Sequence, residues 1–415
     1  MCLNLCGAVL GSFNYYSKNK KYYYSFDIKW EWELLLIMKT PDIILKGSDN
    51  GEGMIIHCKT KKGTDIFALA IPNIYEGENW DLGPTWCYLI LGKKNILIDT
   101  GRFGNYGLFK TLLKTIDKKP SDIDRIIVTH SHEDHDGNIW DIISANEVEI
   151  WAHPIYSQMI SYHTNIENGA RHPELPGSCR LCFMPDKFIS SCKQYLYNRS
   201  LLNIDFDIED NLYISEDNLR FIHTPGHSAD SICIILEDEV IFTGDTILPG
   251  ITPRPTMEAA FKYDRLILPE EYRKENMLYG LMTYIKSLNK IMKLESQHLE
   301  TILPSHRLFY KKKFNLLDSA PQRANEIIQF HIDRCHSILE IIDKRPLSIN
   351  DIVVEHFDAS LLIGSGKKMA KLEILAHIEI LKKYGDICYV DEKNRIPKST
   401  GTINFLKHLN EALDN

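Results

Sequence analysis

The stretch THSHEDHDGN, residues 129–138, places three histidines and two aspartates within ten positions. Drawing so many titratable side chains together out of water costs free energy unless something binds them. His130 and His132 are two positions apart, and Asp134 and His135 are neighbours. On a loop that leaves a strand, one pair can face one ion and the other pair a second. Imidazole and carboxylate groups are suitable ligands for zinc, manganese or iron, so this stretch predicts a metal site.

Further candidate ligands follow predicted strands elsewhere in the chain. His227 lies in HTPGHS, Asp245 in FTGDT and His306 in LPSH, while Asp99 ends the strand-like run KNILIDTG. Loops at the ends of strands in a rigid scaffold often carry catalytic residues. We therefore expect these side chains to join the histidines of residues 129–138.

The order of predicted elements indicates layers of sheets and helices. Short β-rich runs from residue 38 to about 110 precede repeated helix-to-strand steps, and strands return after residue 215. This alternation is typical of an α/β layered core. The stretch 156–210 is irregular in pattern and is interpreted as an insertion over that core. Beyond residue 320, three predicted helices and a hairpin follow one another in the order of a winged-helix domain.

The complete pattern resembles the metallo-β-lactamase-fold hydrolase superfamily over residues 60–310 or so. The resemblance rests on an aspartate after a strand, the full H-x-H-x-D-H motif, and a later histidine, aspartate and histidine in order. It implies the α+β fold class, as a four-layer αβ/βα sandwich with metals at one edge of two facing sheets. A small C-terminal helical, winged-helix-like domain would follow this sandwich.

The resemblance also implies a role for each candidate residue. One metal would be held by His130, His132 and His227. A second would be held by Asp134, His135 and His306, and Asp245 would bridge the two. Asp134 and Asp99 are the candidate catalytic residues, with Asp99 orienting a ligand histidine from behind. His153 and His223 have no ligand position and are interpreted as ordinary buried histidines.

The implied reaction is hydrolysis. Two cations about 3.5–4 Å apart can share a water and lower its pKa toward 7, which provides a metal-activated hydroxide. We expect two divalent ions, with zinc as the expected metal and manganese or iron as alternatives. The segment HTPGHSADSICIILEDEVIFTGDTIL (223–248) resembles the branch containing glyoxalase II and β-lactamase-like protein 2. The expected substrate is therefore a small ester, thioester or lactone.

Three alternatives to this function remain open. The helical tail also resembles the β-lactamase-like protein 2 branch, which implies a metal-dependent endoribonuclease with nucleic acid as its partner. However, residues 321–415 carry 13 Lys and Arg against 14 Asp and Glu, whereas phosphate binding needs clustered positive charge. A mono-iron sulfur dioxygenase of the same fold and a winged-helix binding protein are the others. We expect a small-molecule partner in preference to nucleic acid.

The predicted insertion carries a second candidate metal site. Its side chains are His172, Cys179, Cys182 and Cys192. A C-x-x-C pair with a third cysteine and a histidine can form a structural zinc site. Because a second C-x-x-C pair is missing, reduced thiols on a lid over the substrate pocket are the preferred interpretation.

Residues 1–37 are interpreted as a non-native or disordered extension, followed by a catalytic domain at 38–320 and the helical domain at 321–415.

Composition limits the remaining classes of protein. The net charge is −8, so no general attraction to nucleic acid or anionic membrane follows. No run approaches the roughly 20 apolar residues of a membrane helix, so no membrane partner is expected. Ten scattered cysteines indicate a reducing, cytoplasmic location. The sequence predicts no particular oligomeric state.

Overall fold

The structure is a computed structural model of the 415-residue chain. It describes residues 41–73, 82–162, 194–296, 299–364, 366–391, 393 and 396–414. The predicted extension at 1–37 and the candidate site of His172, Cys179, Cys182 and Cys192 lie outside the described residues.

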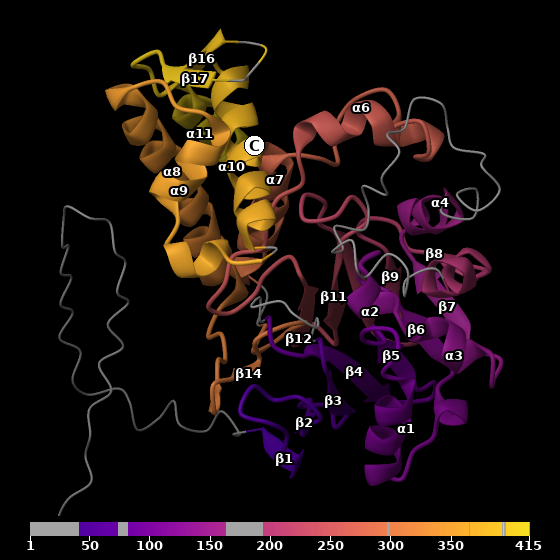
Figure 1. The fold of residues 1–415 in the computed structure, drawn as a ribbon. Coiled ribbons are helices and arrows are strands. Elements are labelled where there is room, and N and C mark those ends of the chain that lie inside the picture. Colours follow the sequence, from indigo (N-terminus) through magenta and orange to yellow (C-terminus); the bar gives the residue numbers. More distant parts are fainter. Residues whose placement is uncertain are drawn as a thin grey trace, which may run out of the picture. The chain divides into compact units, whose positions relative to one another are not determined.

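Two β-sheets form the centre of the described fold (Figure 1). The first has eight strands in sequence order, antiparallel up to β5 and parallel from β5 to β8. These strands are β1 (Asp42–Leu45), β2 (Ile55–Lys59), β3 (Asp65–Ile71), β4 (Thr85–Leu91), β5 (Ile96–Ile98), β6 (Arg125–Ile127), β7 (Glu149–Ala152) and β8 (Phe206–Asp207).

The second sheet has five strands in the order β13-β12-β11-β10-β9. Only the β12–β13 pair in it is parallel. These strands are β9 (Tyr213–Ile214), β10 (Leu219–His223), β11 (Ile232–Leu236), β12 (Val240–Gly244) and β13 (Thr301–Pro304). A small hairpin of β14 (Phe309–Tyr310) and β15 (Lys313–Phe314) follows.

Alternating side chains place the two sheets face to face. On β11, Ile232 and Ile234 pack into the core between the sheets, whereas Cys233 and Ile235 pack against helices on the other side. This is the two-residue period of a strand that is buried on both faces. The outer face of the first sheet is covered by helices α1 (Tyr106–Thr115), α3 (Ile139–Ile143) and α4 (Pro154–Tyr162).

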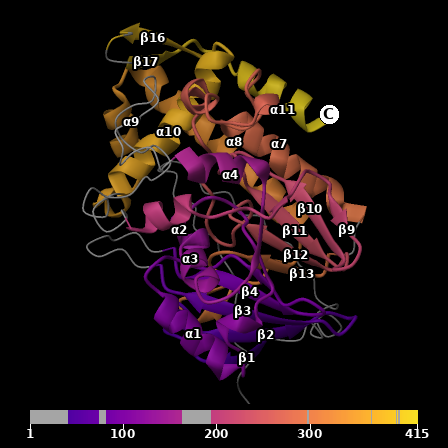
Figure 2. The ribbon, with the colours of Figure 1, turned by 90° about the vertical axis from the view of Figure 1, so that its right-hand side faces the viewer.

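Helix α7 (Leu281–Met292) covers the outer face of the second sheet, which completes four layers (Figure 2). Helix, sheet, sheet and helix therefore follow in order, and the predicted α+β sandwich is confirmed. Short helical segments lie in the connections between these layers. They are η1 (Pro120–Asp122), α2 (Glu133–Asp136), η3 (Glu258–Ala260), α6 (Phe261–Asp264), η4 (Glu270–Tyr272) and η5 (Lys293–Ser296).

Parallel pairing brings the candidate ligands to common sheet edges. The neighbours β5 and β6 run parallel, so the loops that begin after them start at the same edge. The same holds for β12 and β13. Asp99 and the loop 129–138 follow the first pair, while Asp245 and His306 follow the second. This topology explains how positions far apart in sequence can meet.

The chain beyond residue 319 is mainly helical, and its elements appear in the predicted order. They are α8 (Ala320–Lys344), α9 (Ile349–His356), η6 (Ala359–Leu362), α10 (Gly366–Lys383), β16 (Ile387–Asp391), β17 (Ile396–Ser399) and α11 (Asn404–Asp414). The Ser348 side chain caps α9 by accepting from the Asp351 N–H, and Gly385 follows α10 at a φ of 78°. The last helix, α11, was not predicted. Membership of the winged-helix class stays a prediction, as do the domain boundaries.

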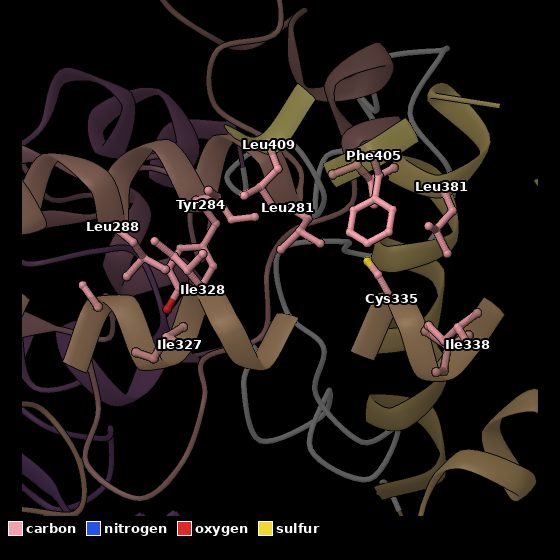
Figure 3. Packing of buried hydrophobic residues seen from close by; sticks show 14 of the residues in the cluster. Leu281, Tyr284, Leu288, Ile327, Ile328, Cys335, Ile338, Leu381, Phe405 and Leu409 are labelled. Atoms are coloured by element: carbon pink, nitrogen blue, oxygen red, sulfur yellow. The ribbon is translucent and has the colours of Figure 1, made fainter. Parts of the chain in front are cut away.

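The tail shares a hydrophobic core with α7 and the outer face of the second sheet. Figure 3 shows Leu281, Tyr284 and Leu288 of α7 beside side chains of the tail. Their partners are Ile327, Ile328, Cys335 and Ile338 of α8, Leu381 of α10, and Phe405 and Leu409 of α11. The tail is therefore packed against the sandwich through buried apolar contacts.

The prediction that residues 156–210 are irregular is wrong at both described ends of that stretch. Helix α4 continues to Tyr162, residues 194–200 are helical, and β8 lies within the range. Helix α4 forms because Ile155, Tyr156, Met159 and Ile160 repeat at helical spacing, and all four are buried.

None of the helices in the described part of the chain has the length and apolar character needed to cross a membrane.

Candidate metal centre

Three histidine nitrogens converge at the edge between the two sheets. The His132 Nδ1 atom lies 2.9 Å from His130 Nε2 and 3.2 Å from His227 Nε2. The Asp245 Oδ2 atom lies 3.4 Å from His227 Nε2, and the donor atoms of these four residues lie within 4.8 Å of one another. His130 and Asp245 are buried, and His132 and His227 are partly buried. We call His130, His132 and His227 the first ligand set.

A second group of donors lies beside the first. The Asp134 Oδ2 atom is 3.2 Å from His306 Nε2 and 3.7 Å from His135 Nε2. The Asp245 Oδ1 atom lies 3.6 Å from His135 Nε2 and 3.5 Å from His306 Nε2. We call Asp134, His135 and His306 the second ligand set. Asp245 therefore directs one carboxylate oxygen toward each set, so the structure brings together all seven side chains that the sequence singled out.

Several buried atoms in this group have no hydrogen-bond partner among the described residues. They are His135 Nε2, His306 Nε2 and Asp245 Oδ1. A buried polar atom without a partner carries an unfavourable desolvation free energy. All three atoms face the same small space, and nitrogen and carboxylate oxygen donors suit a divalent cation. The residues present therefore fit a bound metal.

The outward nitrogens of three histidines have acceptors that orient each ring. His227 Nδ1 lies 3.1 Å from the Arg254 carbonyl oxygen, and His306 Nδ1 lies 3.1 Å from the Pro84 carbonyl oxygen. His135 Nδ1 lies 2.7 Å from Asp99 Oδ2. When each of these nitrogens donates its N–H, the Nε2 lone pair faces inward, as a metal ligand requires.

Asp99 ties the loop after β5 to the loop after β6. It is buried and has a φ of 56°, a left-handed conformation that aspartate tolerates better than most residues. Its carboxylate accepts from the Thr129 N–H at 2.8 Å and from the Thr129 hydroxyl at 2.7 Å, in addition to His135. The Thr100 N–H donates to the His135 carbonyl oxygen at 2.6 Å. These contacts hold His135 from both its ring and its backbone.

Without a bound metal, the pKa values of the histidines are shifted in opposite directions in the two ligand sets. Burial and neighbouring imidazoles hold the pKa of His130 well below its usual value, and burial with His227 lowers the pKa of His132 to about 3. Burial and Arg254 lower the pKa of His227 to about 3. These three rings are neutral at pH 7, which leaves their lone pairs available to a cation.

In the second ligand set, neighbouring carboxylates raise the histidine pKa by more than burial lowers it. Burial alone would lower the pKa of His135, but Asp134, Asp99 and Asp245 raise it to about 10. The pKa of Asp134 is well below its usual value, because His135 and His306 outweigh the effect of burial. A proton therefore occupies this set in the protein alone, and a divalent cation would displace it on binding.

Comparison with known proteins identifies the family. Residues 80–270 match the family model described as "Metallo-beta-lactamase superfamily". The chain contains a metallo-beta-lactamase superfamily domain. This family, the metal-ligand groups and the thioesterase-named relative below together support an enzyme, a hydrolase of this superfamily that binds divalent metal.

Two curated relatives show the extent of the similarity. A "Beta-lactamase-like protein 2 homolog" from Drosophila melanogaster is 24% identical over 256 residues, which cover 61% of this chain and 69% of the fly protein. An "Atrochrysone carboxyl ACP thioesterase" from Passalora fulva is 30% identical over 163 residues, which cover 38% of this chain and 36% of the fungal protein. The chain thus spans about two thirds of the first relative and about a third of the second.

A solved structure supports the fold. The crystal structure of a metallo-beta-lactamase family protein from Thermus thermophilus superposes with a TM-score of 0.58 at 20% identity. It covers 80% of this chain and 98% of the Thermus chain. At this level of identity the likeness concerns the fold.

The structure adds residues to the candidate metal centre that the sequence did not indicate. Arg199 donates to the Ser131 carbonyl oxygen at 2.7 Å and forms an ion pair with Asp136 Oδ2 at 2.7 Å. It therefore holds the ligand loop, residues 129–138, at two points outside the ligand sets. Asn73 donates to Asp134 Oδ2 at 2.8 Å. Asn73 follows a predicted strand, a position that could have drawn attention to it. Nothing in the sequence around Arg199 indicated its contact with Ser131.

Other polar residues near the candidate metal centre contact groups outside the two ligand sets. The His153 and His223 rings stack with their centroids 3.9 Å apart, His153 Nδ1 accepts from the Ile155 N–H at 3.2 Å, and His223 Nε2 lies 2.8 Å from the Ala229 carbonyl oxygen. Neither histidine belongs to the two ligand sets. Glu133, inside the motif, lies 3.8 Å from Arg102 Nε. These contacts account for three polar side chains without assigning them to a metal.

A third group of buried donors lies in the tail. His331 Nδ1 is 3.0 Å from His377 Nε2, and Glu373 lies beside both rings. The carboxylate of Glu373 already forms an ion pair with Arg334. A positive charge next to this carboxylate opposes a divalent cation, so we assign no metal to the group.

The glycine that ends the ligand loop has no room for a side chain. A Cβ atom at Gly137 would lie 2.0 Å from the Phe103 nitrogen and 2.5 Å from the Glu133 carbonyl oxygen. Both are backbone atoms that cannot turn aside. We expect Gly137→Ala to destabilise the fold by about 3 kcal/mol or more, as overpacking does, and to displace His135. Chemical denaturation measures the first effect and metal content the second.

Gly107→Ala is the matched control. Gly107 is exposed within α1, and a Cβ atom there meets nothing within 4 Å. Because alanine favours helix over glycine, this variant should be more stable by about 0.5–1 kcal/mol. If Gly137→Ala and Gly107→Ala were equally stable, the inference that Gly137 has no room for a Cβ atom would be contradicted.

Proposed function

We propose that the chain is a dinuclear metal-dependent hydrolase that acts on a small ester, thioester or lactone. The observation that carries the proposal is the placement of Asp245, whose two carboxylate oxygens face two separate ligand sets. A carboxylate in this position can bridge two ions. Two-metal sites in hydrolases use such a bridge to hold their ions about 3.5–4 Å apart.

The proposed ligands follow from the two sets. His130, His132 and His227 would hold one ion, and Asp134, His135 and His306 the other, with zinc as the expected metal and manganese or iron as alternatives. Such ions would polarise the carbonyl of the substrate and lower the pKa of a bound water toward 7.

The residues of the chain prepare this site in three ways. Neutral rings in the first set present lone pairs at pH 7. Asp99 holds the His135 ring through Nδ1, and Asn73 orients the Asp134 carboxylate. The short distances between donors from four different strand ends leave little freedom for rearrangement on metal binding, which favours a preorganised site.

The substrate class draws on the thioesterase-named relative from Passalora fulva. Thioesters, esters and lactones share an electrophilic carbonyl that a polarising cation activates. RNA remains an alternative substrate through its phosphodiesters. Against it, 13 basic and 14 acidic residues over 321–415 provide no excess of positive charge for a phosphate backbone.

A substrate panel with controlled metal content tests the proposal. The 415-residue chain is loaded with zinc and assayed on an acyl thioester, an aryl ester, a lactone and a labelled RNA, with and without chelator. We expect chelator-sensitive turnover of at least one carbonyl substrate and two metal equivalents per chain by elemental analysis. RNA cleavage without carbonyl turnover would support the nuclease instead. In protein purified without added metal, one iron per chain with oxygen consumption would support the dioxygenase.

A further inference from the structure

The loop from Asp245 to η3 is held by tail residues. Arg323 of α8 donates from Nε to the Leu248 carbonyl oxygen at 2.9 Å and from Nη2 to the Ile251 carbonyl oxygen at 2.9 Å. Arg323 thus fixes the part of the loop that follows Asp245. Its side chain is largely buried, so these carbonyl contacts are shielded from water.

The other end of the loop is held by α10. The Glu379 carboxylate accepts from the Glu258 N–H at 2.6 Å and from the Ala259 N–H at 3.2 Å. The first N–H groups of a helical turn have no acceptor within the helix, so a carboxylate there supplies what η3 lacks. Lys383 of α10 adds an ion pair to the Glu258 carboxylate at 2.7 Å. Two tail helices therefore clamp one loop at both ends.

The middle of this loop contacts the first ligand set directly. The Arg254 carbonyl oxygen accepts from His227 Nδ1 at 3.1 Å. Thr256 donates to the Gly226 carbonyl oxygen from its N–H at 2.6 Å and from its hydroxyl at 2.8 Å. Arg254 thus holds the ring of His227, and Thr256 holds the backbone of the preceding residue, Gly226.

Two features make the loop able to transmit a displacement. Pro253 and Pro255 flank Arg254, and proline fixes φ, so the segment cannot absorb a shift by free rotation at these positions. Gly226 has a φ of 132°, and a Cβ atom there would lie 2.4 Å from Tyr284 Cα, so its backbone is confined against α7. A shift of η3 would therefore move the Arg254 carbonyl oxygen relative to His227.

We propose that Glu379 and Arg323 are positioning residues for His227, and that the tail serves the metal centre by holding the loop between Asp245 and η3. The inference rests on the proposed role of His227 as a ligand. Neither residue touches the site. Each acts through the loop by keeping the Arg254 carbonyl oxygen where it orients the ring of His227. This role connects α10 to a ligand more than 150 positions earlier in the chain.

Metal affinity provides the test, because it requires no knowledge of the substrate. The 415-residue chain and its Glu379→Met variant are titrated with zinc against a chromophoric chelator. Residues that support a metal ligand typically contribute 10–100-fold to affinity, so we expect about a tenfold loss in one of the two binding steps. Glu379→Gln keeps one acceptor oxygen and should lie between the parent and Glu379→Met. Arg323→Met should act in the same direction.

Glu340→Met is the matched control, and Lys383→Met tests the most exposed contact of the clamp. Glu340→Met changes an exposed glutamate of α8 and should leave zinc affinity unchanged. Lys383→Met removes only the ion pair to Glu258, and exposed ion pairs contribute little, so its effect should be within twofold.

The outcome that overturns the proposal is a Glu379→Met variant with parental zinc affinity in both steps, whatever its melting temperature. If this variant fails to fold, parental affinity in Glu379→Gln and Arg323→Met overturns it equally. A parent protein that binds two zinc ions but turns over no substrate contradicts the proposed hydrolase alone, since the zinc titration still decides the role of Glu379.

Discussion

His132→Ala is expected to lower zinc affinity of the first ligand set by more than about 100-fold, or roughly 2.7 kcal/mol, and to abolish nearly all hydrolysis. His132 lies between the other two rings, with its Nδ1 atom 2.9 Å from His130 and 3.2 Å from His227. The substitution removes a metal-binding atom itself. The loss of zinc affinity should therefore exceed the 10–100-fold typical of residues that only hydrogen-bond to a metal ligand. Zinc titration and turnover of the preferred substrate measure the two effects.

The fold should survive this substitution, because His132 belongs to a polar loop and to none of the buried hydrophobic clusters. Thermal melting of the metal-free variant should therefore match the metal-free parent. His57→Ala is a suitable control, since His57 lies on β2 with Asp65 2.8 Å away and takes no part in either ligand set. Parental zinc affinity in His132→Ala would contradict the assignment of the loop to metal binding.

Asp245→Asn is expected to leave one ion tightly bound and to weaken the other by roughly 10–100-fold. The carboxylate lies 3.4 Å from His227 on one side and about as close to His135 and His306 on the other. An amide presents only one oxygen and no charge, so it cannot bridge two cations as a carboxylate does. Hydrolysis that depends on both ions should fall by at least the same factor.

Elemental analysis after dialysis distinguishes the outcomes for this variant. We expect close to one equivalent of zinc, against two in the parent. Asp238→Asn removes an exposed carboxylate from the turn between β11 and β12 and should retain both ions. Two tightly bound ions in Asp245→Asn would show that Asp245 is not the bridge, although the ligand sets themselves could still bind metal.

Local sequence accounts for much of the fold. Most of the strands and helices of the sandwich follow apolar periods that can be read directly, such as the two-residue alternation of β11. Two helix ends also follow from residue type, since serine is a preferred N-cap and glycine a preferred residue after a helix, and Ser348 and Gly385 occupy these positions. The described ends of the stretch 156–210 and helix α11 were missed. In α4 the apolar face is short, whereas α11 carries a regular apolar face of Phe405, Leu406, Leu409 and Leu413 whose helical spacing could have revealed it.

The sequence by itself determined which side chains gather at the site, because a loop as rich in histidine and aspartate as 129–138 needs something to bind it. It also placed the later candidates at strand ends, where parallel pairing could bring them together. The family resemblance already implied that Asp245 bridges two sets and that Asp99 orients a ligand histidine. Only the tertiary structure decided that this histidine is His135, how the donor atoms are spaced, and that Arg199 supports the loop. These depend on contacts between residues tens to hundreds of positions apart, which no local pattern encodes. The same holds for Glu379, whose partner N–H groups belong to a loop that only the packing of α10 brings within reach.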